Sequence, residues 1–173
     1  SQLRTFNSNS RFHYAAITAF SERLAELAPD GLDTVFLVNS GSEAVDLALH
    51  LAQVVTGRMD VLAVREAYHG WTLLSDAVTT SLYDNPTAME TRPDWAHFSS
   101  APNTFRGRFR GPDSGDDYAA EVRALVDELV AGGRPPAAFI CEPVFGNAGG
   151  VMLPEGYLPQ VYDAVRAAGG LCI

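Results

Sequence analysis

The clearest chemical signal in the sequence is the run Asn-Ser-Gly-Ser-Glu-Ala at residues 39–44. It lies where a strand-like segment gives way to a helical one, and the first N–H groups of a helix have no backbone acceptors. With the positive end of the helix dipole, these donors form an anion site. Gly41 lets an anion approach the backbone, and the hydroxyls of Ser40 and Ser42 add donors. The alternative is an ordinary capping box between Ser40 and Glu43.

Two further clusters follow the expected ends of buried strands. Tyr-His-Gly-Trp-Thr at residues 68–72 comes after the strand predicted at 60–64, and Glu142 comes after the one predicted at 137–141. In open α/β sheets, ligands bind outside the carboxyl ends of the strands. The alternatives are core packing with a turn glycine for the first cluster, and a carboxylate held by nearby backbone donors for the second.

Arginine gathers in a long segment without helical or strand periodicity, residues 82–115. Within it, residues 105–110 place three arginines beside two phenylalanines. Most such clusters are solvated surface, but arginine is also the residue that clamps an anionic substrate through two parallel hydrogen bonds.

The surrounding pattern alternates strands with helices. Strands are predicted at 34–38, 60–64, 137–141 and from 171, and helices at 12–27, 44–55, from 116 to the glycines at 132–133, and at 154–168. The helix at 44–55 is apolar on nearly every side, which indicates cover on more than one face. We therefore expect one α/β domain over residues 1–173, with a mainly parallel sheet between two layers of helices.

Composition narrows the function classes. The chain has 173 residues, 47% of them hydrophobic, and a formal net charge of −9, which argues against nucleic acid or an anionic membrane as partner. No apolar run reaches the ~20 residues of a membrane span. Cys141 and Cys172 lie in apolar runs and are expected to be buried free thiols. We expect a cytoplasmic protein without a metal site.

Taken together, the motifs resemble the class III aminotransferases, pyridoxal-phosphate enzymes of fold type I. The matching segments are residues 39–44, 56–58 (Thr-Gly-Arg), 68–70, 142–144 (Glu-Pro-Val), 146–150 (Gly-Asn-Ala-Gly-Gly) and 154–158 (Pro-Glu-Gly-Tyr-Leu). Residues 9–12 and 101–107 also look like the branch that includes alanine–glyoxylate aminotransferase 2-like proteins and phospho-lyases.

The resemblance implies roles for particular residues. Ser40, Gly41 and Ser42 would hold the cofactor phosphate, Tyr68 would stack on the pyridine ring, and His69 and Gly70 would shape that wall. Glu142 would lie near the ring's oxygen side. Candidate substrate contacts are Arg11, Arg106 and Asn147. The parent protein is expected to be a homodimer that uses pyridoxal 5′-phosphate.

One departure from the family bears on activity. All twelve basic residues are arginine, so the chain has no lysine to bind the cofactor covalently. The family's Schiff-base lysine and its aspartate partner to the pyridine nitrogen are expected beyond Ile173. The chain is thus expected to be an inactive piece of a longer protein.

Three functions stay open at this point. The first is amino transfer from an amine or amino acid to a 2-oxo acid, and the second is phosphate elimination from a phosphorylated amine, with Arg11 or Arg106 as anion clamp. The third is a non-catalytic domain that binds a phosphate-bearing ligand.

Overall fold

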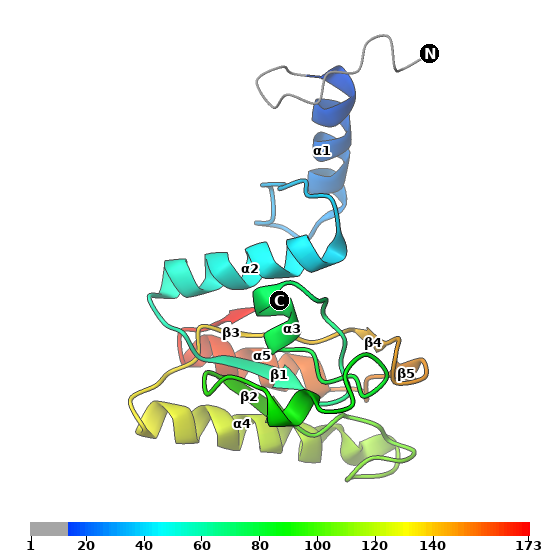
Figure 1. Cartoon of the computed structure of the whole chain (residues 1–173), viewed down its shortest axis with the longest axis vertical. Helices are drawn as coiled ribbons and strands as arrows, with labels where there is room; N and C mark the ends of the chain where they lie inside the picture. Colours follow the sequence, from blue (N-terminus) through cyan, green and yellow to red (C-terminus); the bar gives the residue numbers. More distant parts are fainter. Residues whose placement is uncertain (1–13) are drawn as a thin grey trace. The chain divides into compact units, whose positions relative to one another are not determined.

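The computed structural model describes residues 14–173, and the chain divides into two compact units, residues 1–37 and 38–173. The described part of the first unit contains helix α1 (Ala15–Leu27) (Figure 1). The helix predicted over 12–27 is therefore confirmed from Ala15 onward. No residue of α1 is buried.

The strand predicted at residues 34–38 is wrong. This segment has no regular secondary structure, and three of its apolar side chains, Phe36, Leu37 and Val38, are exposed, Phe36 at 64%. A strand needs a neighbour that pairs with its N–H and C=O groups. None of the strands that the structure describes pairs with these residues.

The second unit holds the sheet and its helices. Its main elements are α2 (Gly41–Thr56), β1 (Val61–Val64), α3 (Leu73–Ala77), β2 (Ala96–Ser99), α4 (Gly115–Ala131), β3 (Ala138–Phe139), β4 (Val144–Phe145), β5 (Val151–Met152), α5 (Tyr157–Ala167) and β6 (Leu171–Cys172). Four strands form a parallel sheet in the order β2-β1-β3-β6. The predicted parallel α/β class is confirmed.

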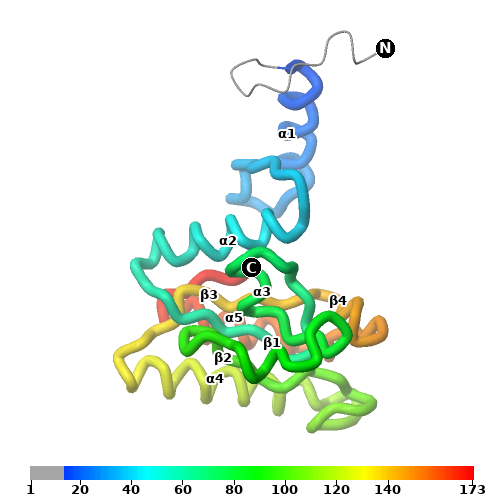
Figure 2. Tube along the Cα trace, in the orientation of Figure 1, coloured from blue at the N-terminus to red at the C-terminus, as the bar shows by residue number. Residues whose placement is uncertain are grey.

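Helices cover both faces of this sheet, as the trace in Figure 2 shows with α2 and α4 on opposite sides. Side chains alternate along a strand, so successive residues of β1 enter different cores. Leu62 and Val64 pack in the core with α4 and α5, whereas Val61 and Ala63 pack with Leu49 of α2. The sequence reads as a continuous apolar run because both faces are buried.

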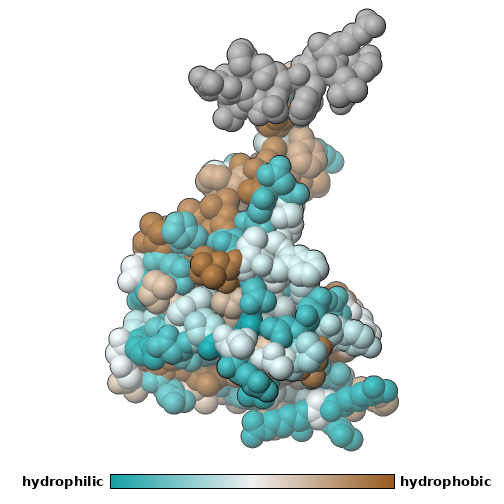
Figure 3. Space-filling view, viewed as in Figure 1, coloured by the Kyte–Doolittle hydropathy of each residue, from teal (hydrophilic) through white to brown (hydrophobic). Residues whose placement is uncertain are grey.

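The apolar helix α2 has one buried and one exposed side. Leu49 and Ala52 are buried against the sheet, but Val54 and Val55 are 63% and 72% exposed. Figure 3 shows hydrophobic surface, in brown, over this helix. The helix ends at Gly57, whose left-handed conformation (φ 66°) suits glycine.

Several short elements were not predicted. Edge strand β2 lies inside the segment without periodicity, and its His97 carries a polar side chain that contacts the Asp60 carboxylate at 2.7 Å. The glycine-rich turn at 146–150 joins β4 to β5 as an antiparallel hairpin. Both cysteines are free thiols as expected, although they are half-buried rather than buried. No helix of the described residues is long and apolar enough to cross a lipid bilayer.

Candidate functional site

The N-terminus of α2 is capped by a side chain, but some of its backbone N–H donors are not used by the cap. The Ser40 hydroxyl accepts the Glu43 N–H at 3.1 Å, and the Glu43 carboxylate accepts the Asn39 N–H at 2.6 Å. The Ser40 cap of the alternative reading is thus observed, but the Glu43 carboxylate returns to the Asn39 N–H and not to that of Ser40, so the capping box is incomplete. This cap leaves the N–H groups of Gly41 and Ser42 without an acceptor in the described chain. A Cβ added at Gly41 would meet nothing within 4 Å, so the space beside it is open.

The segment 68–72 packs directly against this helix end. The Trp71 N–H donates to the Ser42 hydroxyl oxygen at 3.3 Å, and the Thr72 hydroxyl donates to the Ser42 carbonyl at 3.1 Å. Gly70 approaches so closely that an added Cβ would lie 2.8 Å from the Ser42 Cα. Because Ser42 accepts the Trp71 N–H, its own hydroxyl hydrogen remains available for a ligand.

A carboxylate on α2 holds the helix that follows. Asp46 accepts the N–H groups of Leu74 and Ser75 at 2.8 and 3.1 Å, which caps α3. Burial raises the pKa of Asp46, but the hydrogen bonds from these N–H groups outweigh it, so the pKa lies below its ordinary value. The carboxylate therefore stays charged and fixes α3 to α2 over a wide pH range.

Tyr68 and His69 face different surroundings. The Tyr68 ring is partly exposed and meets the Trp71 ring edge-on, with 6.3 Å between centroids. His69 is only 7% exposed, and its Nε2 has no partner among the described residues. Burial lowers the pKa of His69 to about 4, so the imidazole is neutral at pH 7. Tyr68 can thus contact a ligand, while His69 supports the wall from inside.

Glu142 ties the tyrosine to the glycine-rich turn. One of its carboxylate oxygens accepts the Tyr68 N–H at 2.6 Å, and the other accepts the Gly146 N–H at 2.8 Å. The alternative reading of this residue, a carboxylate held by backbone donors, is therefore the observed arrangement. Such bonds between charged and neutral groups are short and strong. Glu142 acts as a positioning residue for both segments.

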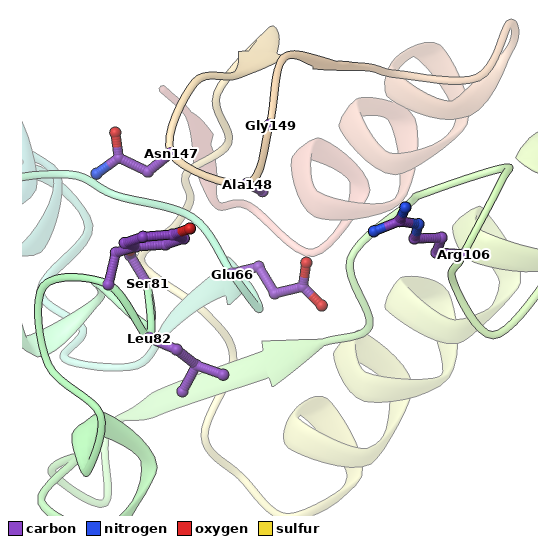
Figure 4. A pocket seen from close by; sticks show the side chains of 8 residues that line it. Glu66, Ser81, Leu82, Arg106, Asn147, Ala148 and Gly149 are labelled. Atoms are coloured by element: carbon purple, nitrogen blue, oxygen red, sulfur yellow. The ribbon is translucent and has the colours of Figure 1, made fainter.

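The remaining candidates do not meet at the Ser42 site. Arg106 and Asn147 line a separate open pocket of about 600 Å³, together with Glu66 (Figure 4). The Asn147 amide donates to the Asp84 carboxylate at 2.8 Å. Arg11 lies outside the described residues.

Two residues of the site region were missed in the sequence. Asp46 is a helical carboxylate whose bonds reach Leu74 and Ser75, far along the chain, so spacing does not reveal it. Glu66 is the single non-glycine residue with positive φ (68°) among those described, and only an Asn, Asp or Gly there would have signalled this conformation.

Comparisons with known proteins point to one family. Residues 2–173 match the family model described as Aminotransferase class-III. The chain is 38% identical to a Drosophila melanogaster protein called alanine–glyoxylate aminotransferase 2-like, over 99% of this chain and 36% of that protein. It is 33% identical to a Caenorhabditis elegans ethanolamine-phosphate phospho-lyase homolog, over 99% of this chain and 39% of that protein.

Solved structures show the same fold. A phospholyase from Arthrobacter in complex with phosphoethanolamine superposes with a TM-score of 0.83 at 32% identity. An omega-transaminase from Thermomicrobium roseum superposes with a TM-score of 0.80 at 26% identity. In each case 99% of this chain covers 40% of the other chain. The chain therefore spans well under half the length of the proteins that it matches.

Proposed function

Since the chain belongs to the class III aminotransferase family, we propose that residues 1–173 are the central part of the large, cofactor-binding domain of a pyridoxal-phosphate enzyme. The whole protein transfers an amino group from an amine or amino acid to a 2-oxo acid. The arrangement that carries this proposal is the N-terminus of α2, whose first N–H groups have no acceptor among the described residues. Hydrogen bonds from Trp71 and Thr72 hold this helix end against the segment that bears Tyr68.

The residues present fit the cofactor's phosphate. The N–H groups of Gly41 and Ser42, the Ser42 hydroxyl and the positive end of the α2 dipole all favour an anion at an open surface. Tyr68 offers an aromatic face at the neighbouring wall, and Glu142 fixes its backbone. The cofactor, when bound, supplies the electron sink for the reaction, and these residues supply placement.

A binding measurement on this chain tests the phosphate site. Ser42→Ala removes one hydrogen bond to a charged group, so we expect pyridoxal phosphate to bind about 1.5–3 kcal/mol more weakly in equilibrium dialysis. Thr34→Ala deletes an exposed hydroxyl in the other unit and is expected to change nothing. Equal affinities for wild type and Ser42→Ala would contradict the placement of the phosphate.

The chain alone is proposed to be inactive because it contains no lysine. We expect borohydride reduction of the chain with pyridoxal phosphate to leave a pyridoxyl group only on the amino group of Ser1. A stoichiometric adduct elsewhere, found by peptide mapping, or turnover by the chain would contradict this.

Phosphate elimination is the second candidate, because the relatives include a phospho-lyase homolog and a phospholyase structure. Such an enzyme needs an anion clamp, and Arg106 shares its pocket with the Glu66 carboxylate, which repels a doubly charged phosphate. Supplying the whole protein with phosphoethanolamine and measuring released phosphate separates the two reactions.

The exposed apolar side of α2 supports a homodimer of the whole protein. Val54 and Val55 are the most exposed apolar residues of this helix, and such surfaces mark association sites. Light scattering that shows a monomer at micromolar concentration would contradict this. A cytoplasmic location also stays a prediction, since some related proteins are called mitochondrial.

A further inference from the structure

Two residues of α2 bind the same neighbouring segment, residues 71–75. Ser42 and Asp46 are four positions apart, so they lie one above the other on one side of the helix. Ser42 binds the segment through its hydroxyl and carbonyl, and Asp46 binds it through its carboxylate. The segment leads into the short helix α3, which Figures 1 and 2 show beside α2. The two helices are thus joined at two points one turn apart.

The charge of Asp46 is unfavourable for an anion at the start of α2. Its carboxylate lies one helical turn from Ser42 and is ionised at pH 7, so it repels a phosphate there. Its Oδ1 atom accepts both the Leu74 and the Ser75 N–H groups, at 2.8 and 3.1 Å. A favourable contribution of Asp46 to phosphate binding can therefore act only through the segment that this oxygen holds.

A continuous set of hydrogen bonds connects this carboxylate to the Ser42 hydroxyl. The Ser75 hydroxyl accepts the Thr72 N–H at 3.1 Å, and the hydroxyl oxygens of these two residues lie 2.8 Å apart. The Thr72 hydroxyl donates to the Ser42 carbonyl at 3.1 Å. The adjoining Trp71 N–H donates to the Ser42 hydroxyl oxygen at 3.3 Å. Ser75 is fully buried, so water does not replace the bonds that it makes.

The last of these bonds sets the direction of the Ser42 hydroxyl hydrogen. A hydroxyl oxygen that accepts an N–H still has its own hydrogen to donate. Without the Trp71 N–H, the Ser42 hydroxyl is free to turn and donate to a nearby backbone carbonyl, as serine side chains do. That bond competes with a phosphate for the same hydrogen. Holding Trp71 in place therefore keeps the hydrogen available for a ligand.

We propose that Asp46 is a positioning residue for the phosphate site. By holding the N-terminus of α3, it keeps the Trp71 N–H on the Ser42 hydroxyl and so directs that hydroxyl toward the phosphate. A charged acceptor makes shorter and stronger bonds to two N–H groups than a neutral one, which suits an acidic residue to this task despite its charge. The inference rests on the function proposed above and extends it to a carboxylate that is engaged by α3.

Equilibrium dialysis of pyridoxal phosphate with this chain and two Asp46 variants tests the proposal through the sign of the effect. Asp46→Ala removes a negative charge, which by itself would strengthen phosphate binding, but it also releases α3. We expect Asp46→Ala to weaken binding about five- to tenfold, the loss of about one hydrogen bond. Asp46→Asn keeps an acceptor oxygen and lacks the charge, so it should bind at least as tightly as wild type. Asp127→Ala, which removes an exposed carboxylate of α4, is the control and should change nothing.

A double-variant cycle with Ser42 shows whether the effect passes through its hydroxyl. In the Ser42→Ala background there is no hydroxyl to direct, so Asp46→Ala should cause no further loss of affinity. Thr72→Val deletes the hydroxyl that donates to the Ser42 carbonyl and should reproduce both results, which keeps the test intact if Asp46→Ala does not fold. Pyridoxal, which lacks the phosphate, should bind equally to the wild type and to every variant.

Two results would overturn the proposal. One is unchanged or tighter binding to Asp46→Ala, because the carboxylate would then act by its charge alone or not at all. The other is a loss that is equally large in the Ser42→Ala background, which would indicate a general structural effect. If Ser42→Ala weakens pyridoxal phosphate while Asp46→Ala does not, only the positioning role is contradicted. If Ser42→Ala changes nothing, the proposed function fails, and this inference fails with it.

Discussion

Replacing Gly70 by alanine tests the contact between the α2 N-terminus and the segment at 68–72. The added Cβ would lie 2.6 Å from the Ser42 Oγ, 2.8 Å from the Ser42 Cα and 2.7 Å from the Ser75 Oγ. The two hydroxyl oxygens can rotate away, but the Cα is backbone and cannot. Gly70 also has φ +132°, which disfavours residues with a Cβ.

Two costs combine in this variant. The unfavourable backbone conformation costs about 1–3 kcal/mol, and overpacking against α2 costs another 1–3 kcal/mol or so. We therefore expect Gly70→Ala to lower the free energy of unfolding by about 2–6 kcal/mol in urea, followed by tryptophan fluorescence. Because the clash moves Ser42, pyridoxal phosphate affinity should fall as well.

Two other glycines separate these costs. Gly133 has φ +73° and nothing within 4 Å of an added Cβ, so Gly133→Ala reports backbone strain alone, at about 1–2 kcal/mol. Gly41→Ala meets neither obstacle and is expected to leave stability within about 0.5 kcal/mol. If Gly70→Ala costs no more than Gly133→Ala, the close packing of Gly70 on Ser42 is refuted.

Two further predictions concern stability. The unfolded state binds a proton on His69 near pH 6.5, but the folded state binds it only near pH 4. As the pH is lowered from 6.5 to 4, the free energy of unfolding should therefore fall by up to about 1.4 kcal/mol per pH unit. His69→Phe should flatten that dependence in urea melts at several pH values, and an unchanged slope would speak against a buried neutral imidazole. Arg58 donates to the Pro136 and Ala168 carbonyls at 3.1 and 2.8 Å, so Arg58→Ala should cost about 1.5–3 kcal/mol. Arg65→Ala, an exposed arginine whose side chain has no partner in the described chain, is the control and should cost almost nothing.

Short sequence patterns were enough to predict the buried strands and the cap of α2. The buried strands at 60–64 and 137–141 are continuous apolar runs because helices cover both faces, and Gly57 ends α2 in the left-handed conformation. The Ser40 cap and the N–H donors at the start of α2 follow from residue types at fixed spacing.

Features that depend on distant partners were not predictable. Segment 34–38 has a strand-like composition but no pairing strand among the described residues, so pattern alone misled. The edge strand β2 includes His97, whose polar side chain is held by Asp60 from a neighbouring segment. Glu66 owes its left-handed conformation to bonds that its neighbours make with residues 80, 81 and 99. Its place opposite Arg106 could not be read from spacing.

The most direct test of the cofactor-phosphate site is an amide NMR titration of this chain with pyridoxal phosphate, with pyridoxal as the matched probe that lacks the phosphate. The N–H groups of Gly41 and Ser42 have no acceptor among the described residues, and Glu43 follows them at the open end of α2. We predict that the amide signals of Gly41, Ser42 and Glu43 shift with pyridoxal phosphate and with inorganic phosphate, but not with pyridoxal. Unmoved signals at these residues, or equal shifts with pyridoxal, would contradict a phosphate site at the N-terminus of α2.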